Sequence, residues 1–212
     1  MNVNIRNIEP KDYRKLEIIA REAFWNLYFP GCDEHYVIHK IKNHPDYIKD
    51  LSFLIELNNE IVGGIFFTKS KIKKKDKKVY NTITFGPVFI NPKYHRKGLG
   101  RALISHSIEK AREAGYLAIL TLGYPYHYET YGFTGGKEYG ISMEDGKFYK
   151  GLLVLPLSQN ALKGIQGKAE FSSVYEVDKN ELNIFDKTFI PKEKEITESQ
   201  REYEIASSML DD

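Results

Sequence analysis

Hydrophobic and polar side chains follow first a strand period and then a helix period along the N-terminal part of the chain. Residues 3–8 alternate between apolar and polar side chains, as in a half-buried β-strand. Across residues 12–24 apolar side chains recur at steps of three and four, which predicts an amphipathic helix ending near Leu27. Residues 34–43 repeat the helical pattern, so we expect a second, shorter helix.

A strand pair and a lysine-rich segment come next. Residues 51–57 and 61–68 predict a hairpin joined by Asn58-Asn59, in which Gly63-Gly64 marks a bulge or a close approach of neighbouring backbone. Six lysines lie within residues 71–78. We interpret this run as a solvated hairpin loop rather than a nucleic-acid contact, because it lacks interleaved aromatic residues.

The middle of the chain predicts a strand, a turn, a helix and a strand. The first strand covers residues 79–90, and the helix covers residues 101–114, with Gly115 in the position favoured for a helix C-cap. Residues 116–122 are continuously apolar, as in a buried strand. Further strand patterns lie at residues 139–143, 152–157 and 169–177, and further helical patterns at residues 180–187 and 197–210.

Composition narrows the class of protein without naming it. The 212 residues are 42% hydrophobic and 28% charged, which indicates one globular domain with at most a small appendage. A net charge of +2 does not indicate nucleic-acid binding, and the single cysteine, Cys32, excludes an internal disulfide and a cysteine-rich metal site. Because no apolar run reaches the length of a signal peptide or membrane span, we expect a cytoplasmic protein with no metal, nucleic-acid or membrane partner.

The candidate chemistry lies in the turn Tyr-His-Arg-Lys-Gly-Leu-Gly-Arg, residues 94–101, between a predicted strand and a predicted helix. Amides at a helix start lack partners within the helix, and the helix dipole favours an anion there. Gly98 and Gly100 carry no Cβ atoms that would keep a pyrophosphate away from the chain. The Gly-Lys-Ser/Thr ending of a P-loop is absent, and Leu103 stands where a Rossmann fingerprint needs a glycine. Coenzyme A remains as a ligand, beside the alternative of an ordinary glycine-rich turn.

A resemblance to a known family favours coenzyme A as the ligand over an ordinary glycine-rich turn. Residues 88–101, with the following helix and strand, and Tyr128 followed by Gly132-Phe133 resemble the core of the GNAT superfamily of acyl-CoA-dependent N-acetyltransferases. Leu122-Gly123 and Pro125 before that tyrosine resemble small bacterial-type members. The family turn reads Gln or Arg, two residues, Gly, one residue, then Gly or Ala. His95 occupies the first position here, a departure that leaves both glycines intact.

The resemblance implies a fold and a division of the chain. The expected fold is α+β, with a central mixed, mostly antiparallel twisted sheet flanked by helices. Residues 1–157 would form the acetyltransferase domain. Residues 158–212 would form a C-terminal extension that packs on or continues the sheet and ends in a helical tail.

The resemblance also implies a cofactor and its binding residues. Acetyl-CoA would lie along the splayed strand and the turn, where an amide such as that of Val88 could polarise the thioester carbonyl. In the family a tyrosine returns a proton to the departing thiolate, and Tyr128 takes that role by resemblance. The residues expected to bind the cofactor are Val88, Phe89, Ile90, His95, Arg96, Lys97, Gly98, Leu99, Gly100 and Arg101.

The activity implied is direct transfer of an acetyl group from acetyl-CoA to a primary amine, on a small molecule or a peptide. Asp33 and Glu34 suggest a cationic acceptor by charge alone. Candidates by residue type for the general base are Glu22, Glu34, His35 and His127. Two other classes stay open, a non-catalytic acyl-CoA-binding regulatory module and a nucleic-acid-binding protein that uses the lysine run. A homodimer is also left open.

Overall fold

The structure, a computed structural model, describes residues 2–211, which form two compact units. Unit 1 contains the residues up to Phe67, Gly86–Ser107 and Ser173–Arg201. Unit 2 contains Thr68–Phe85, Ile108–Ser172 and the residues from Glu202 onward. Two strands and two helices of the chain have residues in both units, and each unit is described by itself below.

Unit 1 is built on antiparallel strands β1 (Val3–Asn7), β2 (Phe53–Leu57) and the first part of β3 (Glu60–Lys73). Asn58 and Asn59 have φ values of 49° and 67°, the left-handed conformation that a two-residue hairpin turn requires. The β2–β3 register shifts between Ile55 and Glu56, so the bulge predicted near Gly63-Gly64 is present.

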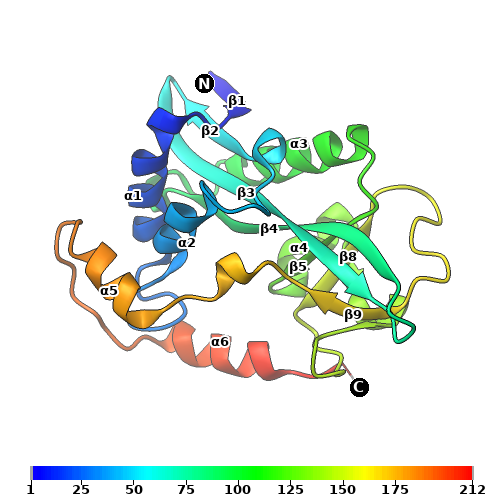
Figure 1. Ribbon diagram of the computed structural model, residues 1–212. Coiled ribbons are helices and arrows are strands. Elements are labelled where there is room, and N and C mark those ends of the chain that lie inside the picture. Colours follow the sequence, from blue (N-terminus) through cyan, green and yellow to red (C-terminus); the bar gives the residue numbers. More distant parts are fainter. Residues whose placement is uncertain (1, 212) are drawn as a thin grey trace. The chain divides into compact units, whose positions relative to one another are not determined.

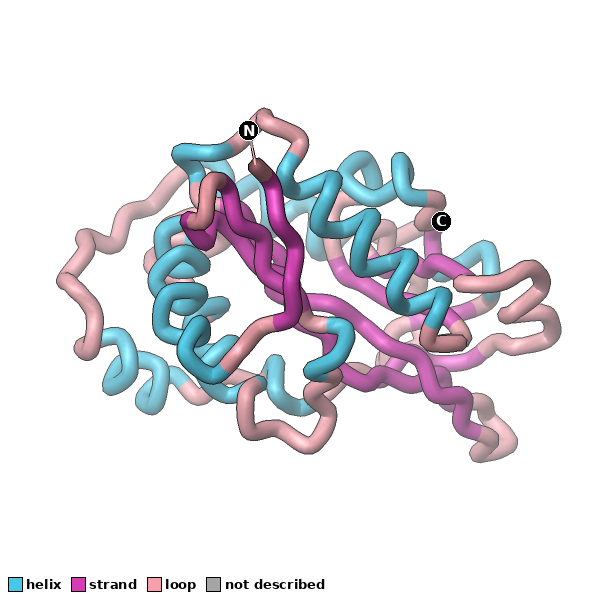
Figure 2. Tube along the Cα trace, turned by 90° about the horizontal axis from the view of Figure 1, so that it is seen from above, coloured by secondary structure: helices cyan, strands magenta, loops and turns pink. Residues whose placement is uncertain are grey.

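Helices cover both faces of the unit 1 strands (Figures 1 and 2). Helices α1 (Tyr13–Phe24) and α2 (Glu34–Ile41) share one apolar core with Leu54 and Phe66 of the strands. Phe53, which points to the opposite face from Leu54, packs edge-on against His106 of α3 (Leu99–Glu113), with ring centroids 4.8 Å apart. The α1, α2 and α3 helices thus match the three helices predicted from the apolar periodicity.

The C-terminal part of unit 1 lies against α1 and α2. It contains α5 (Lys179–Asp186) and the start of α6 (Glu198–Ser208), both near their predicted positions. The Asp178 side chain accepts hydrogen bonds from the amides of Asn180 and Glu181, which caps α5. Short 3-10 turns lie at Pro10–Asp12, Lys49–Leu51, Pro92–Tyr94 and Ser173–Tyr175.

Unit 2 surrounds a second apolar core that includes Ile72, Leu120 and Val154. Strand β5 (Ala118–Leu122) pairs in parallel with β4 (Val79–Ile90) and antiparallel with β8 (Leu152–Pro156). The shorter elements of this unit are α4 (Pro125–Tyr128), β6 (Thr134–Gly135), β7 (Ile141–Ser142), β9 (Gly167–Glu170) and the 3-10 turns Glu129–Tyr131 and Gly136–Tyr139.

Hydrogen bonding gives the strand order β1-β2-β3-β4-β5-β8-β6, with β9 pairing both β3 and β7. The β4–β5 and β7–β9 pairs are parallel, whereas β1–β2, β2–β3, β3–β9, β5–β8 and β6–β8 are antiparallel. The predicted mixed, mostly antiparallel sheet with flanking helices is therefore confirmed. Because β9 joins the sheet, part of the predicted extension continues it. The domain boundary at residue 157 stays a prediction.

The interpretation of the whole lysine run as a loop is wrong. Strand β3 continues to Lys73, and Lys71 and Lys73 pair in register with Glu170 and Lys168 of β9. Ile72 between them is fully buried, so the segment alternates as a half-buried strand does. The turn occupies residues 74–78 only.

Two of the weaker strand predictions are too long. The strand expected at residues 139–143 is reduced to β7, because residues 136–139 form a 3-10 turn. The strand expected at residues 169–177 ends at Glu170, where the chain leaves β3. Among residues 2–211 no helix is long and apolar enough to cross a membrane.

Candidate functional site

The turn between β4 and α3 is exposed and is anchored by a single buried side chain. Side chains from His95 to Gly98 are exposed, whereas Leu99 is 5% exposed and fixes the first turn of α3 in the core. Arg96 and Gly98 have φ values of 59° and 77°. A Cβ atom added at Gly98 would meet nothing within 4 Å, so the space above this glycine is open to a ligand.

The backbone donors of this turn are not used by the described chain. The first intrahelical bond of α3 runs from the Ala102 amide to the Gly98 carbonyl. Within residues 2–211 no hydrogen bond is donated by the amides of residues 96–100. Because these amides lie at the positive end of a 15-residue helix, they are free to donate hydrogen bonds to an anion such as a pyrophosphate.

Two side-chain contacts hold the turn on the strands beneath it. His95 Nε2 lies 2.8 Å from the Ile90 carbonyl oxygen, so its ring bridges the turn to the end of β4. The Tyr94 hydroxyl donates to Glu60 Oε2 at 2.8 Å, and the Lys97 ammonium lies 5.2 Å from the Tyr94 ring centroid. His95 stands where the family turn has Gln or Arg, and in this chain that side chain contacts the Ile90 carbonyl of the protein itself.

The end of β4 presents backbone beside the turn. Phe89 is 4% exposed and packs in the core against Phe24 at a ring-centroid distance of 6.3 Å, whereas Val88 and Ile90 are half-buried. A Cβ atom at Gly63 would lie 2.4 Å from the Phe89 carbonyl oxygen, so this glycine allows β3 to approach β4 closely. Ile90 Cγ1 would lie 3.7 Å from a Cβ atom at Gly100, which puts the strand end against the first turn of α3.

Tyr128 belongs to unit 2, where it ends α4. Its ring packs against Phe85 and Phe133, with centroids 5.6 and 5.7 Å away. A Cβ atom at Gly123 would lie 2.6 Å from the Tyr128 ring, so the glycine of the Leu122-Gly123 motif makes room for it. Burial raises the pKa of Tyr128 to about 12, and its hydroxyl has no hydrogen-bond partner among the described residues. At neutral pH the phenol is a proton donor rather than a base.

The sequence family is decided by comparison with known proteins. A family model described as "Acetyltransferase (GNAT) family" matches residues 16–129, from α1 to the turn after α4. This chain belongs to the GNAT family. The matched residues include β4, the open turn, α3 and Tyr128, on which the resemblance rested, and end before Gly132-Phe133, the remaining part of it.

Relatives of the GNAT chain share its fold at low identity. The uncharacterized N-acetyltransferase YhbS of Escherichia coli strain K12 is 25% identical over 112 residues, which are 53% of this chain but only 65% of that protein. The crystal structure of Escherichia coli YhbS in complex with CoA superposes with a TM-score of 0.73 and 20% identity, covering 84% of this chain and 93% of that one. A Brucella melitensis GNAT acetyltransferase in complex with acetyl-CoA gives a TM-score of 0.67 and 18% identity, covering 82% and 98%.

The four base candidates of the GNAT chain have different surroundings. Glu22 Oε2 lies 2.8 Å from the Lys192 ammonium, and His35 is completely buried. His127 is exposed, its ring lies 4.3 Å from that of Tyr126, and partial burial lowers its pKa. Glu34 is half-buried beside Asp33, and burial followed by the Asp33 charge raises its pKa to about 8. Of the four, His127 lies in unit 2 with Tyr128, whereas Glu22, Glu34 and His35 lie in unit 1.

Asp33 and Glu34 form a pair of carboxylates that makes no direct ion pair among the described residues, although the charge of Lys40 acts on Asp33 against the effect of burial. Burial also raises the pKa of Asp33. Glu34 Oε2 accepts a hydrogen bond from the Asp33 amide at 3.2 Å, and no cationic side chain of the described residues pairs with either carboxylate. Among residues 2–211 no cluster of three or more ligating side chains could hold a metal ion.

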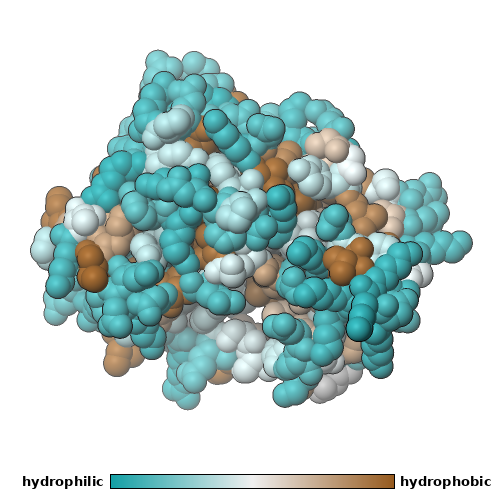
Figure 3. Space-filling view, viewed as in Figure 1, coloured by the Kyte–Doolittle hydropathy of each residue, from teal (hydrophilic) through white to brown (hydrophobic). Residues whose placement is uncertain are grey.

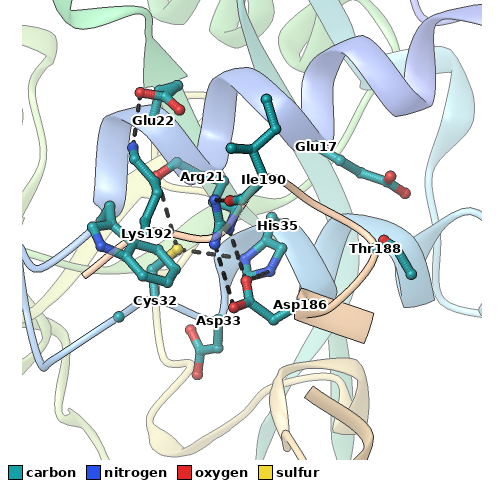
Figure 4. A network of polar contacts seen from close by, with 12 residues as sticks. Glu17, Arg21, Glu22, Cys32, Asp33, His35, Asp186, Thr188, Ile190 and Lys192 are labelled. Atoms are coloured by element: carbon teal, nitrogen blue, oxygen red, sulfur yellow. Dashed lines mark hydrogen bonds and ion pairs between the residues drawn. The ribbon is translucent and has the colours of Figure 1, made fainter. Parts of the chain in front are cut away.

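A buried polar network beside this pair was not foreseen from the sequence (Figure 4). Arg21 Nε lies 2.7 Å from Asp186 Oδ1, and His35 Nε2 lies 3.2 Å from the same oxygen without hydrogen-bond geometry. Cys32 Sγ lies 3.4 Å from His35 Nδ1. Burial raises the pKa of Cys32 far above its ordinary value and lowers that of His35 to about 4, so this cysteine is an inert thiol beside a neutral imidazole.

Proposed function

We propose that the chain is an acetyl-CoA-dependent N-acetyltransferase that acts on a cationic primary amine by direct transfer. The observation that carries the proposal is the set of unused amides at residues 96–100, at the start of α3 and directly after β4. Coenzyme A fits this turn because Gly98 leaves the approach open and Lys93, Arg96, Lys97 and Arg101 add positive charge around it. The YhbS structure is a complex with CoA and the Brucella structure a complex with acetyl-CoA, which supports the same ligand here.

The residues expected to bind the cofactor form two groups, one for the pyrophosphate and one for the pantetheine arm. The turn from His95 to Arg101 would hold the pyrophosphate through its backbone amides. Val88, Phe89 and Ile90 would hold the pantetheine arm through strand amides and carbonyls, and the Val88 amide would polarise the thioester carbonyl. Acetyl-CoA brings the acetyl group as an activated thioester, and the protein contributes alignment of the two reactants.

We propose Glu34 as the general base. Its pKa of about 8 suits proton removal near neutral pH far better than that of an ordinary carboxyl group. Glu22 is paired with Lys192, and His35 is sealed in the core, so neither suits the role. The carboxylate pair Asp33 and Glu34 makes no direct ion pair with a cationic side chain of the described residues, and an acceptor ammonium would form one.

The reaction is then a balanced transfer. Glu34 accepts a proton from the ammonium, and the freed amine nitrogen attacks the thioester carbonyl carbon. A carbon–nitrogen bond forms and the carbon–sulfur bond breaks. Tyr128 donates its proton to the departing thiolate, so that free coenzyme A and an acetylated amine leave.

The first experiment is thermal denaturation with and without acetyl-CoA. Ligand at a hundred times its dissociation constant should stabilise the folded chain by about 2.7 kcal/mol. The second is release of free thiol from acetyl-CoA in the presence of a panel of primary amines. Binding without thiol release would leave a non-catalytic acyl-CoA-binding module, and no stabilisation at millimolar acetyl-CoA would refute the proposal.

A further inference from the structure

The C-terminal segment of unit 1 runs along helix α1 and is held by polar contacts at successive turns. We call residues 186–200 the C-terminal strap. The Arg14 guanidinium donates to the Thr188 carbonyl at 2.6 Å, and Arg21 Nη1 donates to the Ile190 carbonyl at 3.1 Å. Figure 4 shows Ile190, Thr188 and Asp186 of the strap lying over α1 and α2. Both arginines lie on α1, whose apolar side chains pack in the core of unit 1.

The strap is fixed at its start by a charge pair whose guanidinium is buried and whose carboxylate is partly exposed. Arg21 is 3% exposed, and its partner is the Asp186 carboxylate, which also lies 3.2 Å from His35. Phe185 and Phe189 enclose the His35 ring, with centroids 5.6 and 5.1 Å away. Removing one partner of such a pair leaves an uncompensated buried charge, which is far more costly than the loss of a surface contact.

The other end of the strap holds the loop that follows α1. Trp25 Nε1 donates to the Glu193 carbonyl at 2.7 Å. The Asn26 carbonyl accepts from Thr197 Oγ1 at 2.9 Å and from Gln200 Nε2 at 3.0 Å, and the Leu27 carbonyl accepts from Ser199 Oγ at 2.8 Å. The loop carbonyls are thus satisfied by strap side chains, and the loop continues directly to Asp33 and Glu34.

The strap is an addition to the part of the chain that the family model matches. That match ends at residue 129, whereas α1, the loop and α2 lie within it. Apart from Phe189, which packs on His35, the strap is attached by polar groups, since Ile190 and Ile196 are 84% and 89% exposed instead of filling a core. The face seen in Figure 3 is mostly hydrophilic, with hydrophobic side chains in small separate patches. An attachment of this kind can open while the apolar core of unit 1 stays closed.

We propose that Asp186 is a positioning residue for the acceptor amine. Through Arg21 and His35 it holds the strap on the loop after α1, and the strapped loop keeps the Asp33–Glu34 carboxylates arranged for an incoming ammonium. The inference rests on the proposed function, because it assigns the acceptor to that carboxylate pair. The inference predicts different effects on the two substrates. Acetyl-CoA binds at the turn after β4, so its binding does not depend on the strap.

The test compares Asp186→Asn with the control Glu195→Gln. Both variants lose one carboxylate from the strap, but Glu195 is exposed and its side chain makes no ion pair among the described residues. In Asp186→Asn, trypsin should cleave the strap lysines at positions 187, 192 and 194 about tenfold faster, because cleavage needs the backbone around them to detach from the protein and enter the protease active site. The KM for the amine should rise about tenfold, with kcat and the acetyl-CoA dissociation constant within about twofold of wild type. Glu195→Gln should match wild type in every measurement.

Equal cleavage of the two variants, or faster cleavage of Asp186→Asn with an unchanged amine KM, would overturn the inference. If Asp186→Asn does not fold, Trp25→Phe removes the donor to Glu193 and keeps the ring, and it should change the same parameters in the same direction by a smaller factor. Failure of the proposed function has a different signature, since wild-type protein would then release no thiol or bind no acetyl-CoA.

Discussion

The His35 network makes a quantitative prediction about acid stability. His35 is fully buried, and burial lowers its pKa to about 4 against the effect of the neighbouring Asp186 carboxylate. The unfolded chain, with an ordinary histidine pKa of about 6.5, binds more protons between these two values than the folded chain does. The free energy of unfolding must therefore fall as the pH drops from about 6.5 to about 4.

The size of the effect follows from the shift. A difference of about 2.5 pKa units at 1.36 kcal/mol each gives a ceiling of about 3.4 kcal/mol for the loss. The charges of Asp186, Arg21 and Arg14 all act on the ring, and the aspartate works against the shift. A loss of about 2 to 3 kcal/mol is a large part of the stability of a typical domain.

The assay is urea denaturation of wild type and His35→Gln, followed by circular dichroism at pH 7, 6, 5 and 4.5. The variant should be less stable than wild type at pH 7, and its stability should fall much less on acidification. The control is His39→Gln, the same exchange one turn later on α2 at a side chain that is 39% exposed. It should not flatten the pH dependence. Parallel curves for wild type and His35→Gln between pH 6.5 and 4.5 would refute the reasoning.

Three predictions test the candidate site. Tyr128→Phe should lower kcat for thiol release by about a hundredfold through loss of the proton donor, with the acetyl-CoA dissociation constant unchanged; equal kcat would remove Tyr128 from the mechanism. Gly98→Ala should weaken acetyl-CoA binding at least tenfold, as measured by calorimetry. Gly115→Ala, with a φ of 76° and equally open space at the other end of α3, carries the same backbone strain and should not weaken it. In wild type kcat/KM should rise with pH through about 8 as Glu34 ionises, and Glu34→Gln should lose both most of the rate and this limb of the profile.

The turn after β4 could be predicted because its chemistry is local. Its strand, glycines and helix start lie within a dozen or so residues of sequence, and backbone amides at a helix N-terminus follow from geometry alone. The α1 and α2 helices and the Asn58-Asn59 turn could be predicted for the same reason, because periodicity and residue type are also local features of the sequence. The open space at Gly98 and the unused amides are compatible with the cofactor site expected there, which stays a prediction.

The predictions that failed depended on partners far away in sequence. Lys71 and Lys73 are strand residues only because β9 pairs with that stretch of β3 and Ile72 is buried. The sequence predicts no role for Arg21, because its partner Asp186 comes from the far end of the chain and the side chain is buried only in the folded protein. No local pattern distinguishes such residues from ordinary surface charges, because their environment is set by tertiary packing.

The two sides of the proposed reaction therefore differ in how they are built. The cofactor side uses main-chain donors, which every residue except proline supplies, so side chains around the turn can vary as His95 does. The acceptor side uses carboxylates whose pKa values depend on burial, and that burial depends on a loop whose carbonyls are satisfied by the C-terminal strap. Substitutions that detach the strap, such as Asp186→Asn, should then raise the KM for the amine while acetyl-CoA binding stays constant. A segment outside the matched family region would thus determine the specificity of a transfer whose donor is common to the family.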